Sequence, residues 1–278
     1  MSNANCPAVP CRRVIVMVDV TQNAVEKFYD QHAKDHPRYA AILAEPNLFA
    51  SDYRHTAESH QFDRIIDPQP SDVWLEYGSG GGRWMSHVAR RVDRVIGVEL
   101  SPQCAELARH RLRHFPNAEI LVSDLRHYQP PAATSVIYYA GVLLYLDDDE
   151  IGSVLDRHLR DRAGVRRILV RDSLAQDQTH QLHHASGYTA SYRTVERWTE
   201  IFKSVGFDLK RRLPANVAPL TGQEKLDLQF RLTHRLLHTV GRSDRWLRRI
   251  YQRRLNDRMT DGFIDRYRHD FLLFEPDR

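Results

Sequence analysis

The stretch that decides the fold runs from Asp72 to Leu100 and reads DVWLEYGSGGGRWMSHVARRVDRVIGVEL. A short apolar segment, Val73 to Tyr77, is broken by the turn sequence GSGGG. Arg83 to Arg91 then carries apolar residues at helical spacing, and a second apolar segment, Val95 to Val98, ends at Glu99. The pattern predicts strand, turn, helix and strand, with glycines at the first turn and an acid at the tip of the second strand.

This arrangement is typical of a site for a nucleoside cofactor. Glycines allow the backbone to turn sharply and to approach a ligand closely. Glu99 follows the glycines by about 20 residues, where a carboxylate accepts hydrogen bonds from both ribose hydroxyls. A dinucleotide-binding motif would place its third glycine at position 83, which is Arg83. The spacing is instead Glu76-x-Gly78-x-Gly80-x-Gly82.

The acid-x-G-x-G-x-G spacing resembles motif I of the class I S-adenosylmethionine-dependent methyltransferases. The resemblance continues through Asp124, after a third predicted strand, and through Ala140 to Leu146, after a fourth strand at Ser135 to Tyr139. It implies an α/β fold with a Rossmann-like sheet of seven strands and helices on both faces. It also implies S-adenosylmethionine as cofactor and S-adenosylhomocysteine as product. The cofactor contacts that it assigns are Glu76, Gly78, Ser79, Gly80, Gly82, Glu99, Leu100, Ser101, Asp124, Leu125 and Tyr139.

The remainder of the chain is predicted to surround this core as one methyltransferase domain, residues 21–278. Residues 1–20 read as a poorly ordered leader, 21–70 as an N-terminal helical cap, and 71–213 as the cofactor-binding core. Amphipathic and arginine-rich segments at 214–266 predict a helical insertion before a last antiparallel strand at 267–275. The arginines are consistent with contact to a phosphate-bearing substrate, nucleic acid or an anionic membrane surface, and also with a solvated outer face or a dimer contact.

Composition bounds the remaining possibilities. The 278 residues carry a formal net charge of +4, which mildly favours acidic partners. The cysteines, Cys6, Cys11 and Cys104, have neither paired spacing nor histidine partners, so they indicate no zinc site and no disulfide framework. No apolar stretch approaches the length that spans a bilayer. We therefore expect a soluble, cytoplasmic protein.

The acceptor side of the site is predicted to lie at the end of a fifth strand, Arg167 to Asp172, because ligands of open α/β sheets bind at the carboxyl ends of the strands. A polar loop from Leu174 to Ser191 follows it. Methyl transfer to a hydroxyl requires a base, so Asp172 and His184 are the candidate catalytic residues. Tyr145, His183 and Tyr188 are candidates for substrate binding. A solvated loop without a catalytic histidine is the alternative, and no metal site is expected, because no carboxylate cluster accompanies the histidines.

These observations favour O-methylation of a small molecule or saccharide, including acceptors that bear phosphate or carboxylate. The segments 139–146, 170–173 and 192–194 are also similar to protein N-terminal α-amine methyltransferases. Those enzymes have Asp-Asn where this chain has Asp172-Ser173, and a histidine where it has Tyr145. An RNA methyltransferase is a third possibility, although the chain lacks the Asn/Asp-Pro-Pro-aromatic motif that base-amine enzymes usually carry after the fourth strand. A protein that binds S-adenosylmethionine without catalysis is the fourth.

Overall fold

The computed structural model describes residues 20–35, 58–160, 164–216 and 267–277. The predicted leader and almost all of the predicted insertion, including its arginine-rich part, fall outside these ranges, so both stay predictions. Within the described ranges, no helix is both long and apolar enough to cross a lipid bilayer.

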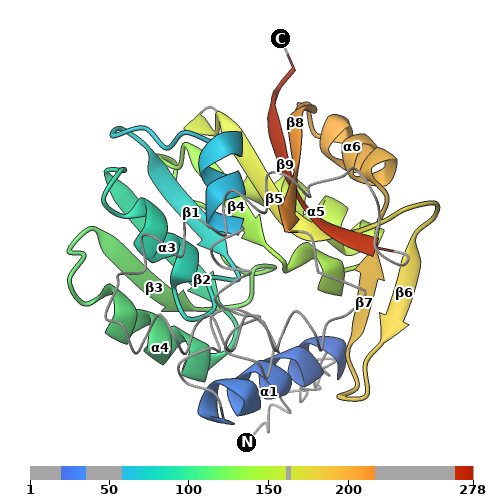
Figure 1. Cartoon of the computed structure of the whole chain (residues 1–278), viewed down its shortest axis with the longest axis horizontal. Coiled ribbons are helices and arrows are strands. Elements are labelled where there is room, and N and C mark those ends of the chain that lie inside the picture. Colours follow the sequence, from blue (N-terminus) through green and yellow to red (C-terminus); the bar gives the residue numbers. More distant parts are fainter. Residues whose placement is uncertain (1–19, 36–57, 161–163, 217–266, 278) are drawn as a thin grey trace, which may run out of the picture.

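The centre of the molecule is the predicted seven-stranded sheet, in the order β3-β2-β1-β4-β5-β9-β8 (Figure 1). Strands β1 to β5 are parallel, whereas β9 is antiparallel to both β5 and β8. The order reverses between β1 and β4, and an open sheet of this kind binds its ligands beside the carboxyl ends of the strands at such a reversal. The strands are β1 (Val73–Tyr77), β2 (Arg94–Glu99), β3 (Ala118–Val122), β4 (Val136–Ala140), β5 (Arg167–Ala175), β8 (Phe207–Asn216) and β9 (Tyr267–Pro276).

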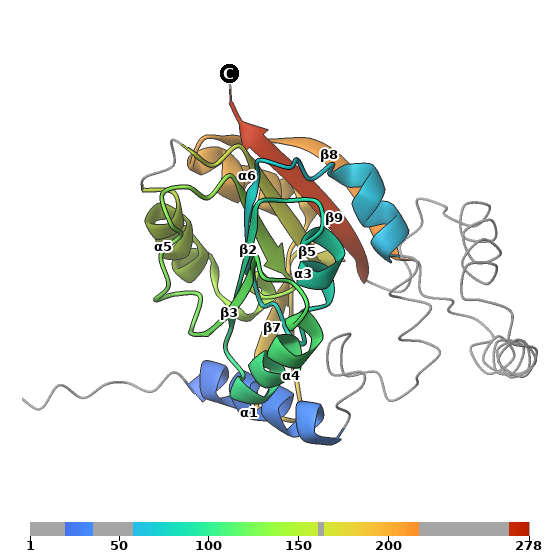
Figure 2. The ribbon, with the colours of Figure 1, turned by 90° about the vertical axis from the view of Figure 1, so that its left-hand side faces the viewer.

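Helices cover both faces of this sheet, as predicted. A helical segment at 58–65 packs on one face with α3 (Arg83–Val88) and α4 (Pro102–Leu112) around Phe62, Trp74 and Trp84. On the other face lie α5 (Asp148–His158) and α6 (Val195–Ser204), packed around Leu155 and Trp198. Figure 2 shows α1 (Val20–Asp35) next to α4, at one end of the sheet rather than on a face. The alternation of side chains along each strand explains the two separate apolar cores.

Three boundaries differ from the sequence prediction. β5 continues three residues beyond Asp172, because β9 pairs with it as far as Ala175. The expected polar loop after β5 contains a hairpin of β6 (His180–His183) and β7 (Thr189–Tyr192), which forms a separate two-stranded sheet. β8 extends to Asn216, so the predicted insertion begins later than residue 214.

The acidic run Asp147 to Glu150 has a structural role at the start of α5. The Asp147 carboxylate accepts a hydrogen bond from the Glu150 backbone N–H (2.8 Å), and the Glu150 carboxylate accepts one from the Asp147 N–H (2.9 Å). This reciprocal pair is a capping box, and the extra acids complement the positive end of the helix dipole.

Candidate functional site

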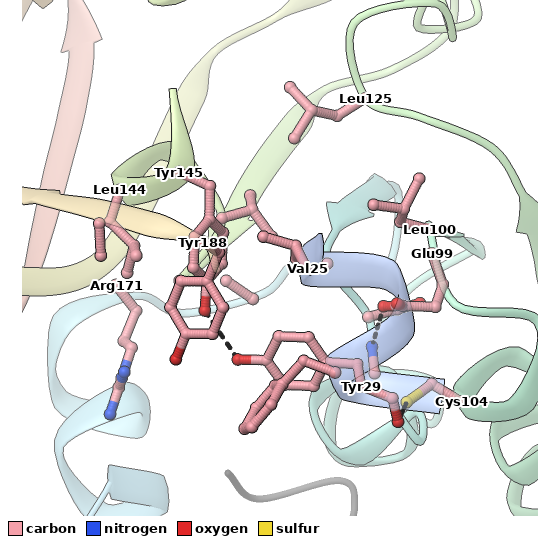
Figure 3. A pocket seen from close by; sticks show the side chains of 18 of the residues that line it. Val25, Tyr29, Glu99, Leu100, Cys104, Leu125, Leu144, Tyr145, Arg171 and Tyr188 are labelled. Carbon is pink, nitrogen blue, oxygen red and sulfur yellow. Dashed lines mark hydrogen bonds between the residues drawn. The ribbon is translucent and has the colours of Figure 1, made fainter. Parts of the chain in front are cut away.

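A pocket of about 430 Å³ lies at the carboxyl ends of β1, β2 and β4, within the range of roughly 300 to 1,000 Å³ that is usual for small-ligand sites. Its walls include the glycine turn after β1, the residues after β2 and β4, and the inward side of α1 and the β6–β7 hairpin. Figure 3 shows Glu99 and Leu100 at one end of this pocket and Arg171 at the other, with Tyr29, Tyr145 and Tyr188 between them. The pocket therefore has two chemically different ends.

The glycine turn brings backbone to the pocket in a conformation that other residues rarely adopt. Gly78 has a φ of 74°, and a Cβ added there would stand 2.0 Å from Cγ1 of Val142. Val142 follows β4, so this contact keeps the first turn tightly against the neighbouring strand end. A glycine is required here by both conformation and space.

Glu99 is held in place by backbone N–H groups at the tip of β2. Its Oε2 accepts a hydrogen bond from the Gly80 N–H (2.7 Å), and its Oε1 accepts one from the Ser101 N–H (2.9 Å). Burial raises the pKa of Glu99 above its usual value, while the N–H groups of Ser101 and Gly80 oppose that shift. Each oxygen retains a second lone pair, so the carboxylate can still accept the two hydroxyl hydrogens of a ribose.

Ser101 lies outside the pocket wall and links α4 to α1, which lines the pocket. It is the N-cap of α4: its Oγ accepts a hydrogen bond from the Cys104 N–H and donates one of 2.5 Å to Asp30 on α1. The Sγ of Cys104 also approaches the Tyr29 carbonyl oxygen. These contacts fasten α1 over the end of the pocket that holds Glu99.

Glu76 is a buried carboxyl group of this site that lacks hydrogen-bond partners among the described residues. Its side chain is fully buried, and neither carboxyl oxygen has a hydrogen-bond partner within the described residues. Burial raises the pKa of Glu76 well above its usual range, although the charge of Arg83 opposes the shift. Since buried polar groups are nearly always paired, these oxygens indicate a missing cationic or hydrogen-bonding ligand.

Two arginines of the pocket wall, Arg83 and Arg171, share the carboxylate of Glu58. Glu58, which is fully buried, accepts hydrogen bonds from Nη2 of Arg83 (2.6 Å) and from Nη2 of Arg171 (2.5 Å). Arg83 begins α3 and Arg171 lies on β5, and both line the pocket. Two guanidinium groups are thus fixed in the pocket wall by one carboxylate.

The loop after β3 is anchored from inside the core. Asp124 lies in the pocket wall, and its carboxylate pairs with Arg126 at 2.7 Å. The next residue, Leu125, accepts a hydrogen bond on its carbonyl oxygen from Nε2 of His158 (2.8 Å). Nδ1 of the same imidazole accepts the Tyr139 hydroxyl hydrogen (2.8 Å), and burial lowers the pKa of His158 to about 4, so the ring is neutral. Tyr139 therefore contacts the loop only through His158.

Tyrosines form the middle of the pocket. The hydroxyls of Tyr29 and Tyr145 are hydrogen-bonded at 2.8 Å, although the residues are 116 positions apart. Tyr188 packs edge-on against Tyr145, and His184 stacks on Tyr188 with ring centres 4.5 Å apart. Burial raises the pKa of Tyr29 to about 12, so this hydroxyl stays protonated at neutral pH. The centre of the pocket consequently presents aromatic faces and hydroxyl donors.

The two predicted catalytic residues do not occupy the positions expected of a base. Asp172 alternates with Arg171 and Ser173 along β5, so it faces the other side of the sheet and is absent from the pocket wall. Nδ1 of His184 accepts the Ser186 N–H (3.1 Å), which places the proton of the neutral ring on Nε2. His184 lines the pocket as a donor in this arrangement.

The pocket wall contains most of the residues predicted to bind the cofactor or the substrate, and one of the two predicted catalytic residues, His184. Those present are Glu76, Gly78, Ser79, Gly80, Glu99, Leu100, Asp124, Leu125, Tyr145, His184 and Tyr188. Gly82, Ser101, Tyr139, Asp172 and His183 lie outside it. Tyr139 stacks on Tyr77 in the core, and the His183 side chain is bonded to Thr189 on the outside of the hairpin. Asp172 and Tyr139, predicted as a catalytic residue and a cofactor contact, therefore do not line the pocket.

Sequence reasoning missed the residues that strand alternation brings to the end of the pocket opposite Glu99. Arg171 and Ser173 are two positions apart and share one face of β5, and Ser173 lies opposite His269 on β9. The Ser173 hydroxyl and Nδ1 of His269 are hydrogen-bonded at 2.9 Å. A period-of-two count along Arg167 to Ala175 would have placed Arg171 and Ser173 together, but nothing local pointed to His269.

The residues present fit S-adenosylmethionine. Glu99 offers a preorganised carboxylate for ribose hydroxyls, and Glu76 offers unpaired buried oxygens for an ammonium group. The glycine turn leaves backbone exposed between them. Within the described ranges, no three His, Cys, Asp or Glu side chains are grouped as metal ligands.

Comparisons with known proteins agree with this architecture. Residues 75–161 match the family model described as a methyltransferase domain. An rRNA methyltransferase of Streptomyces thermotolerans is 28% identical over 158 residues, which cover 55% of this chain and 48% of that protein. The chain thus spans about half the length of this curated relative.

Solved structures show the same fold at low sequence identity. The DhpI complex with S-adenosylhomocysteine (SAH) has a TM-score of 0.52 at 17% identity, covering 69% of this chain and 90% of DhpI. The phosphoethanolamine N-methyltransferase 1 of Haemonchus contortus, in complex with phosphoethanolamine and SAH, has a TM-score of 0.62 at 15% identity. That match covers 93% of this chain and 50% of the Haemonchus chain. The predicted seven-stranded methyltransferase fold is confirmed.

Proposed function

We propose that this chain, whose domain at residues 75–161 belongs to the class I S-adenosylmethionine-dependent methyltransferases, methylates a hydroxyl oxygen of a small molecule or saccharide. The proposal rests on one observation. A single pocket extends from Glu99, which we call the cofactor end, to Arg171, which we call the acceptor end, and α1 and the hairpin form part of its wall. A small acceptor suits a covered pocket of this volume better than a base within a long polynucleotide does.

In this proposal Glu99 binds the ribose and Glu76 binds the ammonium group of the cofactor. When bound, S-adenosylmethionine supplies a methyl group on a positively charged sulfur, which becomes a neutral thioether after transfer. The chain must hold an acceptor oxygen in line with that methyl group, exclude water, and receive the hydroxyl proton. α1 and the hairpin are the walls that exclude water.

The proton needs an acceptor that faces the pocket. Tyr29 remains protonated at neutral pH, and the geometry of His184 makes it a donor. His269 lines the acceptor end, and the Ser173 hydroxyl oxygen can accept a hydrogen bond from its Nδ1; in that tautomer Nε2 is the proton-accepting nitrogen, so we assign the imidazole as the base in place of Asp172 or His184. The Asp172 carboxylate instead accepts a hydrogen bond from the Ser173 N–H (2.7 Å), so we infer that Asp172 orients the end of β5 and does not remove the proton.

Ribosomal RNA methylation is the second candidate, since the Streptomyces thermotolerans relative is an rRNA methyltransferase. The match covers 55% of the chain, and the residues from the end of β4 onward are Ala140-Gly141-Val142-Leu143, without the Asn/Asp-Pro-Pro-aromatic motif. This candidate predicts that the acceptor is an RNA base, which leaves its stacked position and enters the pocket.

The test measures SAH release from S-adenosylmethionine with two acceptor sets, small hydroxy compounds and glycans in one, and unmodified ribosomal RNA in the other. Wild type and Glu99→Ala are compared, with the surface variant Glu106→Ala as control. Turnover with a small acceptor that Glu99→Ala loses and Glu106→Ala keeps supports the proposal. Turnover with RNA alone would replace it by the second candidate, and failure to bind S-adenosylmethionine would refute both.

A further inference from the structure

We propose that Arg171 forms the anion-binding part of the acceptor subsite, so that the acceptors are hydroxy compounds carrying a carboxylate, phosphate or phosphonate group. This inference rests on the proposed function, because it names the substrate class of the same pocket. Ser173 and His269 line the pocket beside it, on the same face of β5 and β9.

Arg171 is a buried cation with unused hydrogen-bonding capacity. Its side chain is 6% exposed, and its single hydrogen-bond acceptor within the described residues is Glu58. The Nε atom is buried and has no partner among those residues. A guanidinium group has five N–H donors and remains charged at any physiological pH, so one bond to a shared carboxylate leaves most of its donors unused.

The space beside the guanidinium is kept open by a glycine. Gly141 lies in the pocket wall after β4, and a Cβ built on it would stand 3.7 Å from Nη1 of Arg171. Any larger side chain at this position would extend toward Nη1. The absence of one leaves that side of the cation accessible from the pocket.

Planar, paired recognition of carboxylate or phosphate oxygens is the interaction for which arginine is best suited. Glu58 fixes the orientation of Arg171 in advance, which reduces the side-chain entropy lost when an anion binds. A lysine on the protein surface would have neither the fixed orientation of Arg171 nor its low-dielectric surroundings.

The anion is assigned to the acceptor rather than to the cofactor because of where Arg171 lies. Figure 3 shows it at the opposite end of the pocket from Glu99, next to Leu144. Arg83, the other guanidinium bonded to Glu58, begins the helix directly after the glycine turn and is the better placed group for the cofactor carboxylate. The pair Arg171 and Arg83 therefore provides a matched comparison.

The experiment measures two quantities on the full chain, the Kd of SAH by calorimetry and the thermal midpoint of the SAH-saturated protein. The midpoint is followed with inorganic phosphate, methylphosphonate or acetate, against sodium chloride at equal ionic strength. We expect a saturable rise with at least one of these anions and none with chloride. The three anions distinguish a phosphate-type group from a carboxylate.

Arg171→Gln should weaken anion binding by about tenfold or more, as expected for loss of a charge-assisted pair, and leave the Kd of SAH nearly unchanged. Arg83→Gln should weaken SAH and retain the anion response at saturating SAH. If Arg171→Gln fails to fold, Arg171→Lys keeps the charge beside Glu58 but loses the planar fork, and should give the same loss in smaller degree.

Three results would overturn the inference: no anion response in the SAH-saturated wild type, an anion response unchanged in the Arg171 variants, or a loss of SAH binding in Arg171→Gln larger than its loss of anion binding. Failure of the proposed function would be recognised separately, because that function requires SAH to bind the wild-type protein whether or not an anion binds.

Discussion

The two ends of the pocket are built in different ways. At the cofactor end, Gly78, Gly80 and Glu99 come from one continuous β-α-β unit, and backbone N–H groups set the geometry of the carboxylate. The middle of the pocket and its acceptor end are formed by Tyr29, Tyr145, Arg171 and His269, which come from α1, the turn after β4, β5 and β9. Local sequence determines the first end, whereas the second exists only after the whole sheet has assembled.

This difference separates the consequences of substitution. A change in the glycine turn alters backbone that many contacts depend on, so it should affect stability and cofactor binding together. A change at the acceptor end alters one side chain among several independent contributors, so it should affect one property at a time.

The largest effect is expected for Gly78→Ala. The new Cβ would lie 2.0 Å from Val142 Cγ1 at a φ of 74°, so overpacking and backbone strain together should cost about 2 to 5 kcal/mol of unfolding free energy. SAH binding should be lost with it. Chemical denaturation and calorimetry measure the two effects.

Gly152→Ala is the matched control for this prediction. Gly152 lies inside α5, and a Cβ there would have no atom within 4 Å. Alanine should therefore stabilise the helix by about 0.5 to 1 kcal/mol without changing SAH binding. Equal effects of the two substitutions on unfolding free energy and on SAH binding would contradict the role assigned to the glycine turn.

An intermediate effect is expected for Asp172→Asn, and it depends on pH. Burial raises the pKa of Asp172 to about 7, against about 3.9 in unfolded chains, so the folded state binds the extra proton between these values. Wild-type stability should consequently fall as pH rises from about 4 to 7, with a slope of at most about 1.4 kcal/mol per pH unit from this group.

The asparagine variant lacks this ionisation, so its stability should be flatter across that range and exceed that of wild type at pH 8. Denaturation curves at a series of pH values provide the measurement. A variant that follows the wild-type slope throughout would mean that Asp172 is not the titrating group.

The smallest effect is expected for Tyr139→Phe, compared with Tyr138→Phe on the opposite face of β4. Removing the Tyr139 hydroxyl leaves His158 Nδ1 unpaired and loosens the Leu125 loop, which should cost about 1 to 2 kcal/mol and weaken SAH a few-fold. The Tyr138 hydroxyl is buried and has no partner in the described part of the chain, so its removal should be neutral or stabilising. A larger loss in Tyr138→Phe would contradict this account of the loop.

Much of the fold could be predicted from the sequence, because the strands, turn and helix of a β-α-β unit are each indicated by residues close together in the chain. The glycine turn, Glu99 and the apolar strands carry the family resemblance, and that resemblance implies the seven-stranded sheet with its antiparallel last strand. The hairpin at 180–192 was expected to be a loop, because His180 to His183 has almost no apolar alternation. The predicted β5 is too short, since the polar pair Asp172-Ser173 is typical of a strand end, whereas pairing with β9 continues the strand to Ala175.

The acceptor end was less predictable for a geometric reason. Asp172 seemed suitable as a carboxylate near a strand end, but a shift of one residue along a strand reverses the direction of the side chain, so its neighbours Arg171 and Ser173 face the pocket instead. His269 is brought to Ser173 only by antiparallel pairing across a large separation in sequence. Such contacts follow from register, which no local pattern specifies.

The separate β6–β7 hairpin has a consequence for how this protein can change over evolutionary time. The hairpin is joined to the main sheet at little more than the Leu174 and Arg193 bridge, and it contributes Tyr188 and Ala190 to the pocket wall. Substitutions, insertions or deletions at its tip can reshape the acceptor compartment while the register of the seven strands stays intact. Under the proposed function, new acceptor specificities can thus arise by changes in the hairpin while the glycine turn and Glu99 stay unchanged.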